Sequence, residues 1–130
     1  MNPGALFELH RKLCVQPPMK NKIYLKTNSR IARLACIWLR SRAVALVWGR
    51  TIHLYGATAD DLLSNPSWLA HEMVHVRQYE FRGVPRFLAS YLWEWVKHGY
   101  YNNRYEREAR DVNRQWDVGT IFDNYKFEIK

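Results

Sequence analysis

Two spacings of apolar residues in the first half of the chain predict two kinds of element. The run Lys22 to Lys26 (KIYLK) is a short apolar stretch between lysines and predicts a strand. From Ser29 to Leu39 the apolar positions recur at helical spacing, which predicts an amphipathic helix capped by its first serine. Two β-rich runs, 43–48 (AVALVW) and 51–55 (TIHLY), flank the dipeptide 49–50 (GR) and indicate a β-hairpin.

Helical spacing dominates the second half of the chain. Three helices are predicted, over 67–79, from Pro85 to a break near Gly99, and from about Arg104 to Trp116. Pro66 stands before the first of them, where proline is common, and Gly83 is expected to end it. The tail, Asp117 to Lys130, is predicted to be either irregular or a terminal strand.

The second of these helices carries an apolar stripe with three aromatic positions. The stripe consists of Phe87, Leu88, Tyr91, Leu92 and Trp95. Its strict helical spacing favours packing in the core over a platform on which a ligand stacks.

Length and composition indicate one folded domain. Apolar residues are 48% of the 130 residues and aromatic residues 15%, which is too much apolar material for a disordered chain. Domains commonly have roughly 100–150 residues. We therefore expect one α+β domain over 1–130, with a small N-terminal sheet and a helix followed by three helices. Residues 1–20 end near Pro17 and Pro18 and are expected to form an arm or a short leading helix.

Positive charge is concentrated in the N-terminal half. The chain has 20 Lys and Arg against 12 Asp and Glu, for a formal charge of +8. The basic residues with few acidic neighbours are Lys20, Lys22, Lys26, Arg30, Arg33, Arg40, Arg42 and Arg50. They form either a solvated face or a surface for nucleic acid, an anionic membrane or an acidic protein partner.

Neither a membrane span nor a signal peptide is expected, because the apolar runs fall well short of about 20 residues and the N-terminal stretch is interrupted by charges. A cytoplasmic protein is the expectation. Cys14 and Cys36 lack the spacing of a thiol zinc cluster or a redox motif, which predicts two reduced thiols.

The clearest chemical signal is the sequence HEMVH at 71–75. Four-residue spacing on a helix puts His71 and His75 on one face, one turn apart, where both imidazoles can reach one metal ion. Zinc suits neutral imidazole, and such helices commonly hold it. Glu72 lies about 100° around the helix from His71. This places it beside a zinc-bound water, where it would act as general base in peptide hydrolysis.

A catalytic zinc site uses three protein ligands and keeps one position open, so a third ligand is expected. Position along the chain leaves four candidates, His98, Glu94, Glu106 and Glu108.

HEMVH followed by YEREA resembles the gluzincin metallopeptidases, whose third ligand is a glutamate in an ExxA-type motif on a later helix. The resemblance covers about residues 65–116 and is greatest, in size, to the minigluzincins. It implies a zincin-like fold, one zinc ion and Glu106 as third ligand, with Glu108 as its rival. Many members place an acidic residue four positions after that glutamate. Arg110 stands there in this chain, so either Asp111 or a backbone carbonyl is expected to orient a histidine.

Donors to the developing negative charge are expected between the ligands. The candidates are His98, Tyr100, Tyr101 and Tyr105. The strand at 51–55 is expected to line the cleft, where an extended peptide could pair with its edge.

Two functions follow from these features. The first is a zinc-dependent metallopeptidase of gluzincin type, with Glu72 assisting attack of a zinc-bound water on a peptide or protein substrate. The second is a catalytically weak or inactive zincin-fold binding module, whose basic surface engages nucleic acid or an acidic protein partner.

Overall fold

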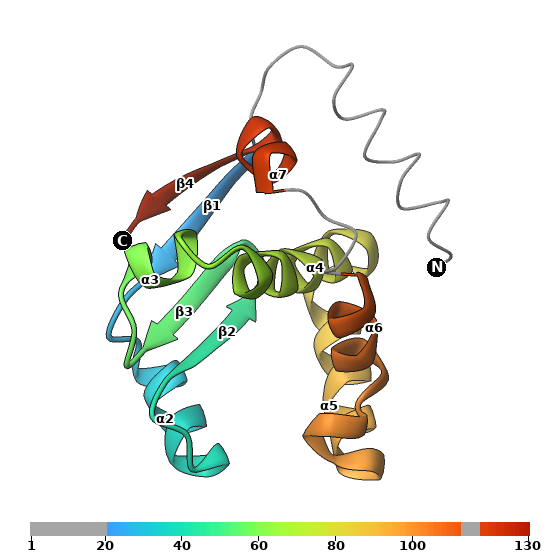
Figure 1. Cartoon of the computed structure of the whole chain (residues 1–130). Coiled ribbons are helices and arrows are strands. Elements are labelled where there is room, and N and C mark those ends of the chain that lie inside the picture. Colours follow the sequence, from blue (N-terminus) through green and yellow to red (C-terminus); the bar gives the residue numbers. More distant parts are fainter. Residues whose placement is uncertain (1–20, 113–117) are drawn as a thin grey trace.

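The structure is a computed structural model that describes residues 21–112 and 118–130, and its architecture is α+β (Figure 1). Its strands are β1 (Asn21–Lys26), β2 (Val44–Trp48), β3 (Thr51–Tyr55) and β4 (Tyr125–Ile129). They form one sheet in the order β2-β3-β1-β4. β1 runs parallel to both of its neighbours, whereas β2 and β3 are antiparallel. The predicted strand and hairpin are confirmed.

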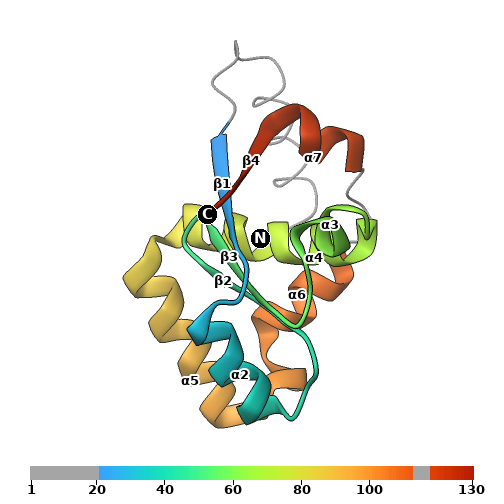
Figure 2. The ribbon, with the colours of Figure 1, turned by 90° about the vertical axis from the view of Figure 1, so that its left-hand side faces the viewer.

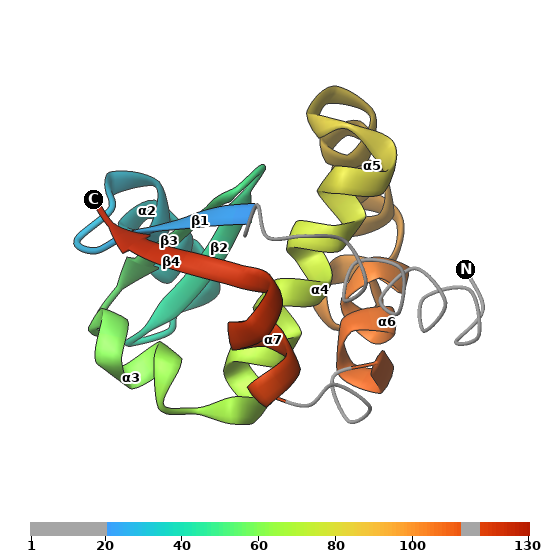
Figure 3. The ribbon, with the colours of Figure 1, turned by 90° about the horizontal axis from the view of Figure 1, so that it is seen from above.

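The helices of the described residues are α2 (Arg30–Leu39), α3 (Ala59–Leu63), α4 (Pro66–Arg82), α5 (Val84–Asn102), α6 (Arg104–Val112) and α7 (Val118–Asn124). Viewed from above, the sheet lies on one side of α4, with α5 and α6 on the other (Figure 3). The core fills the space between the sheet and α4, where Leu69, Met73 and Val76 meet strand residues such as Ile52 and Leu54. Among the described residues, no helix is both long enough and apolar enough to cross a bilayer.

Ser29 caps α2 as predicted and also ties this helix to the sheet. Its hydroxyl oxygen accepts the backbone N–H of Ala32, and the hydroxyl also shares a hydrogen bond of 2.8 Å with Nδ1 of His53. Its own N–H donates to the carbonyl of Leu54. His53 therefore lies buried behind the start of α2, as one of the packing histidines.

The α4 boundaries agree with the sequence signals. The side chain of Asn65 accepts the N–H of Trp68, Pro66 is the first helical residue, and Gly83 ends the helix with a positive φ of 81°. The break predicted at Gly99 is present as a kink inside α5, where φ is 78° and ψ is 176°.

Two helices were missed. α3 falls in the mixed stretch before α4, and a capping box between Thr58 and Asp61 starts it. In the tail the terminal strand is confirmed as β4, but α7 precedes it, and Ile121 and Tyr125 are buried against the core. The last predicted helix ends at Val112, and the rest of its predicted range, 113–117, lies outside the described residues.

The expectation that the strand 51–55 offers an edge to a substrate is wrong. β3 lies between β2 and β1, so both of its edges are paired. Among the described residues the free edge on this side of the sheet belongs to β2, which pairs only with β3.

The aromatic stripe of α5 is also not a core stripe. Phe87 is buried, but Leu92 is 48% exposed and Trp95 is half-buried. α5 leaves the body of the molecule and runs in the same direction as α2 (Figures 1 and 2). The stripe faces α2 across a hollow that both helices line.

Candidate metal site

The two histidines of α4 lie on the side of the helix opposite Leu69, Met73 and Val76, which pack in the core. His75 is buried, and the side chain of His71 is 17% exposed. Their rings lie edge to face with centroids 5.0 Å apart. Because α4 is fixed in the core by its opposite face, both imidazoles are held in one direction, toward α6.

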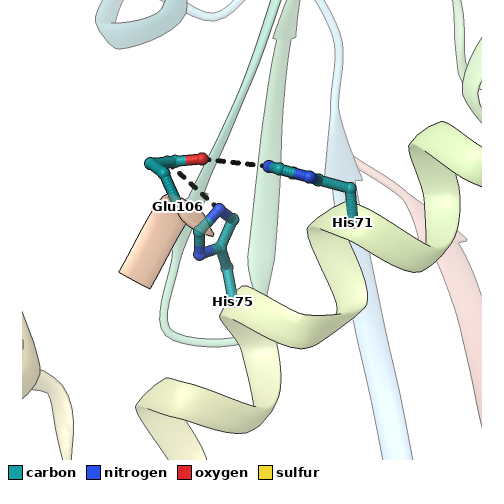
Figure 4. A group of neighbouring side chains, drawn as sticks. All are labelled: His71, His75 and Glu106. Atoms are coloured by element: carbon teal, nitrogen blue, oxygen red, sulfur yellow. Dashed lines mark hydrogen bonds and ion pairs between the residues drawn. The ribbon is translucent and has the colours of Figure 1, made fainter. Parts of the chain in front are cut away.

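Glu106 completes the group. Its Oε2 is 3.0 Å from Nε2 of His71, and its Oε1 is 3.1 Å from Nε2 of His75 (Figure 4). One atom from each residue lies within 4.8 Å of the others, a spacing that could hold a metal ion. Two imidazole nitrogens and a carboxylate oxygen are a donor set that zinc accepts.

The turn between α5 and α6 directs Glu106 back toward α4. Asn103 is fully buried there; its side-chain oxygen accepts the N–H of Tyr105, and its amide donates to the carbonyl of Tyr91. This arrangement starts α6 with Glu106 in its first turn. The hydroxyl of Tyr91 then donates to Oε1 of Glu106 over 2.7 Å, which holds the carboxylate from the α5 side.

Gln78 fixes the tautomer of His75. The amide nitrogen of Gln78 donates to the carbonyl of Tyr105, so its Oε1 must face His75, where it lies 2.8 Å from Nδ1. An amide oxygen only accepts, so Nδ1 carries a proton. The other nitrogen, Nε2, is then the atom available to a metal once it has lost its own proton.

Glu106 and His75 strongly shift each other's pKa. Burial acts to raise the pKa of Glu106, but hydrogen bonds from His71, His75 and Tyr91 hold it well below its usual range. Burial likewise acts to lower the pKa of His75, but Glu106 raises it to about 9. Metal-free, the group is therefore an ion pair, and a bound cation would take the place of the His75 proton at Nε2.

Glu72 lies beside this group and does not join it. It is buried, and burial raises its pKa to about 7, with His75 and His71 acting in the opposite direction. A carboxylate with this pKa can accept and release a proton near neutral pH. That is the property required of a general base.

One transition-state candidate lies close to the ligands. Burial and the negative charges of Glu106 and Glu72 raise the pKa of Tyr100 above its ordinary value, so its hydroxyl stays protonated and can donate. The other candidates point elsewhere. His98 pairs with Glu94 on an exposed part of α5.

Tyr101 and Tyr105 do not serve the site either. Tyr101 is 71% exposed. The guanidinium of Arg110 donates to the backbone carbonyl of Tyr101 and lies over the Tyr101 ring. Tyr105 is buried against Phe87 in the core.

The expected support for a histidine by Asp111 is also not found. Asp111 is exposed, Arg110 is engaged with Tyr101, and a side-chain amide, that of Gln78, orients His75 instead. Glu108, the rival third ligand, is half-buried on α6 but is not part of the ligand group.

Sequence reasoning missed two residues that hold the group in place. Gln78 stands three residues after His75, so helical spacing puts it within reach, and this was a usable signal. Tyr91 was interpreted as a core residue because it belongs to the apolar stripe. Its contact with Glu106 depends on how α5 and α6 pack, which the stripe does not specify.

A groove of about 1030 Å³ runs from the ligand group between α2 and α5. Its floor is β2, its walls are apolar side chains of the two helices, and Glu72, His75 and Glu106 line it as polar members. A site of this kind, mostly apolar with a few convergent polar groups, is typical of ligand and substrate binding.

Comparison of the chain with models of protein families, with curated proteins and with solved structures found no match.

Proposed function

We propose that the protein is a zinc-dependent metallopeptidase of gluzincin type with a zincin-like fold. The observation that carries the proposal is the convergence of His71, His75 and Glu106 with the buried carboxylate of Glu72 beside them. These three residues would hold the zinc ion. When bound, the ion would polarise a peptide carbonyl and lower the pKa of a water molecule.

The chain's own residues supply the remaining chemistry in this proposal. Glu72 accepts a proton from the attacking water and later delivers it to the leaving amine, and its pKa of about 7 suits both transfers. The hydroxyl of Tyr100 donates a hydrogen bond to the carbonyl oxygen as negative charge develops on it, and keeps its proton. Gln78 keeps His75 in the tautomer that leaves Nε2 for the metal.

The free edge of β2 gives an extended peptide a place to bind. In a hairpin with a two-residue loop, the pair next to the loop exchanges hydrogen bonds and the pattern alternates from there. Trp48 pairs with Thr51 in this way, so the backbone groups of Ala45 and Val47 point away from β3. β2 also forms the floor of the groove beside the ligand group, which supports strand addition as the binding mode.

The test combines zinc binding with proteolysis. Purified wild type should bind one zinc ion and cleave casein, Glu72→Gln should bind zinc without cleaving, and Glu106→Gln should lose both properties. Glu108→Gln is the matched control, because it removes a carboxylate two residues away on the same helix and should keep both. Zinc-saturated wild type that leaves casein and a mixed peptide library intact would rule out a peptidase.

A further inference from the structure

The ends of two helices expose large apolar side chains at the same end of the molecule. The C-terminal parts of α2 and α5 both extend away from α7 (Figures 1 and 2). Ile37 and Trp38 on α2 are 66% and 76% exposed, and Trp93 and Val96 on α5 are 64% and 82% exposed. Together with the exposed Tyr101 these side chains are called the apolar tips. Exposed apolar patches mark sites that bind proteins or membranes.

Unpaired arginines lie in the first turn of α2 and on the turn that follows its tip. The exposed residues Arg30 and Arg33 lie on this helix, and Arg40 and Arg42 on the turn after it. The sequence has no acidic residue between Glu8 and Asp60. Within the described part of the chain, none of the four arginines has an ion-pair partner.

The tip of α5 is also free of unpaired negative charge. The ammonium group of Lys97 lies 5.5 Å from the centre of the Trp93 ring. The one acidic residue of α5, Glu94, is already engaged by His98 and Arg104. The two tips therefore combine exposed apolar and aromatic side chains with net positive charge.

We propose that the apolar tips bind the surface of an anionic lipid bilayer. Trp and Tyr favour the boundary between hydrocarbon and water, and arginines beside them attract anionic headgroups. Two protruding tips separated by a groove suit a deformable surface. Pairing with a second copy would bring the unpaired arginines of both chains together, and like charges oppose such an interface.

Bound in this way, the molecule would direct the open side of the groove toward the bilayer. The groove lies between α2 and α5, and the ligand group is at its inner end. Chains at or near the membrane surface would then be the substrates. This consequence depends on the peptidase function proposed above, whereas membrane binding does not.

Co-sedimentation with vesicles tests the proposal on the full chain, using the Glu72→Gln protein so that activity plays no part. Binding is expected to vesicles of equimolar phosphatidylcholine and phosphatidylglycerol, to weaken as salt is raised, and to be far weaker for phosphatidylcholine alone. Arg40→Gln with Arg42→Gln should weaken binding about 25-fold, since each basic residue at an anionic surface contributes about fivefold. The control is Arg107→Gln with Lys126→Gln, which removes the same amount of charge from α6 and β4. It should weaken vesicle binding much less.

A second pair of variants tests the apolar contact. Ile37→Ser and Trp93→Ser should each weaken binding about tenfold, whereas Phe81→Ser, which removes an apolar side chain 69% exposed on α4, should not. Brominated lipid should quench the tryptophan emission of wild type, and less so that of Trp93→Phe. Trp48→Phe is the control for this loss, because Trp48 lies on β2.

Four results would overturn the proposal. The first is no binding to the anionic vesicles. The second is vesicle binding that the tip variants leave unchanged. The third is salt-sensitive binding to an oligonucleotide in place of vesicles. The fourth is a dimer in light scattering that Trp93→Ser dissociates, which would show that a second copy covers the tips.

Discussion

Gln78 accepts the Nδ1 proton of His75 across 2.8 Å, and this contact decides which nitrogen of the imidazole is available to a metal. The amide cannot turn over, because its nitrogen is engaged by the carbonyl of Tyr105. A residue of α4 and the first turn of α6 thus together determine which nitrogen of His75 carries the proton. The group that orients His75 is a neutral side-chain amide, and not the Asp111 carboxylate or the backbone carbonyl that were the two expected alternatives.

Replacing Gln78 should weaken metal binding without removing a ligand. Gln78→Leu keeps the volume but leaves Nδ1 of His75 without an acceptor, and the loss of such a supporting contact typically lowers metal affinity about 10- to 100-fold. Gln78→Glu keeps the acceptor and should bind zinc more tightly than the leucine variant. Competition with a chromophoric chelator measures both affinities. Equal affinity in wild type and Gln78→Leu would contradict the role.

The hydroxyl of Tyr91 should stabilise the protein through its hydrogen bond to Glu106. Tyr91→Phe removes one hydrogen bond to a buried carboxylate and keeps the ring, so the free energy of unfolding in EDTA is expected to fall by about 1.5–3 kcal/mol. Tyr101→Phe deletes an equivalent hydroxyl on the exposed side of α5 and should change it by less than about 0.5 kcal/mol. Urea denaturation followed by circular dichroism gives both values. A similar small change in the two variants would mean that the bond contributes little.

The elements that the sequence predicted are those with a local signal. Ser29 caps α2, Asn65 and Pro66 start α4, and the two residues 49–50 fold back a hairpin, each within a few residues of the pattern that indicates it. The pairing of β1 with β4 has no such signal. It joins strands that are about a hundred residues apart, and only the packed core determines it.

In the candidate metal site, too, spacing along the chain predicted only the part that has a local signal. The spacing of His71 and His75 is a local property of one helix, so their proximity followed from the sequence. Spacing alone left the third ligand open, because Glu106 reaches them only after α5 turns back at Asn103. The apolar stripe of α5 shows the limit clearly. Periodicity identifies an apolar face but not what that face meets, which here is a groove.

His53 should make stability depend on pH. Burial, followed by the positive charges of Lys26 and Lys130, lowers its pKa below 6.5 in the folded protein. Above about pH 6.5 neither folded nor unfolded chain binds the proton. Below this pH, His53 is protonated in the unfolded chain before it is protonated in the folded one. The folded state therefore loses stability as pH falls from about 6.5 toward the lower pKa that His53 has in the folded protein.

His53→Gln removes this titration while keeping a polar partner for Ser29. Urea denaturation in EDTA from about pH 8 to about pH 5 should show a steeper loss of stability in wild type than in the variant. His98→Gln, which changes an exposed histidine on α5, should follow wild type. Parallel curves for wild type and His53→Gln would show that His53 is not kept neutral by the fold.

Gly56 should be the least replaceable glycine of the sheet region. Its φ is 77°, and a Cβ there would lie 2.1 Å from the backbone carbonyl oxygen of Arg42, which cannot move aside as a side chain can. Gly56→Ala is expected to lower the free energy of unfolding by more than about 4 kcal/mol or to prevent folding. Gly99→Ala is the matched control, since φ is 78° but no atom lies within 4 Å of the added carbon. Gly99→Ala should lower the free energy of unfolding only by the strain of a positive φ at alanine, about 1–3 kcal/mol. Soluble yield and urea denaturation compare the two, and a loss at Gly56 no greater than at Gly99 would show that the strand ends are free to separate.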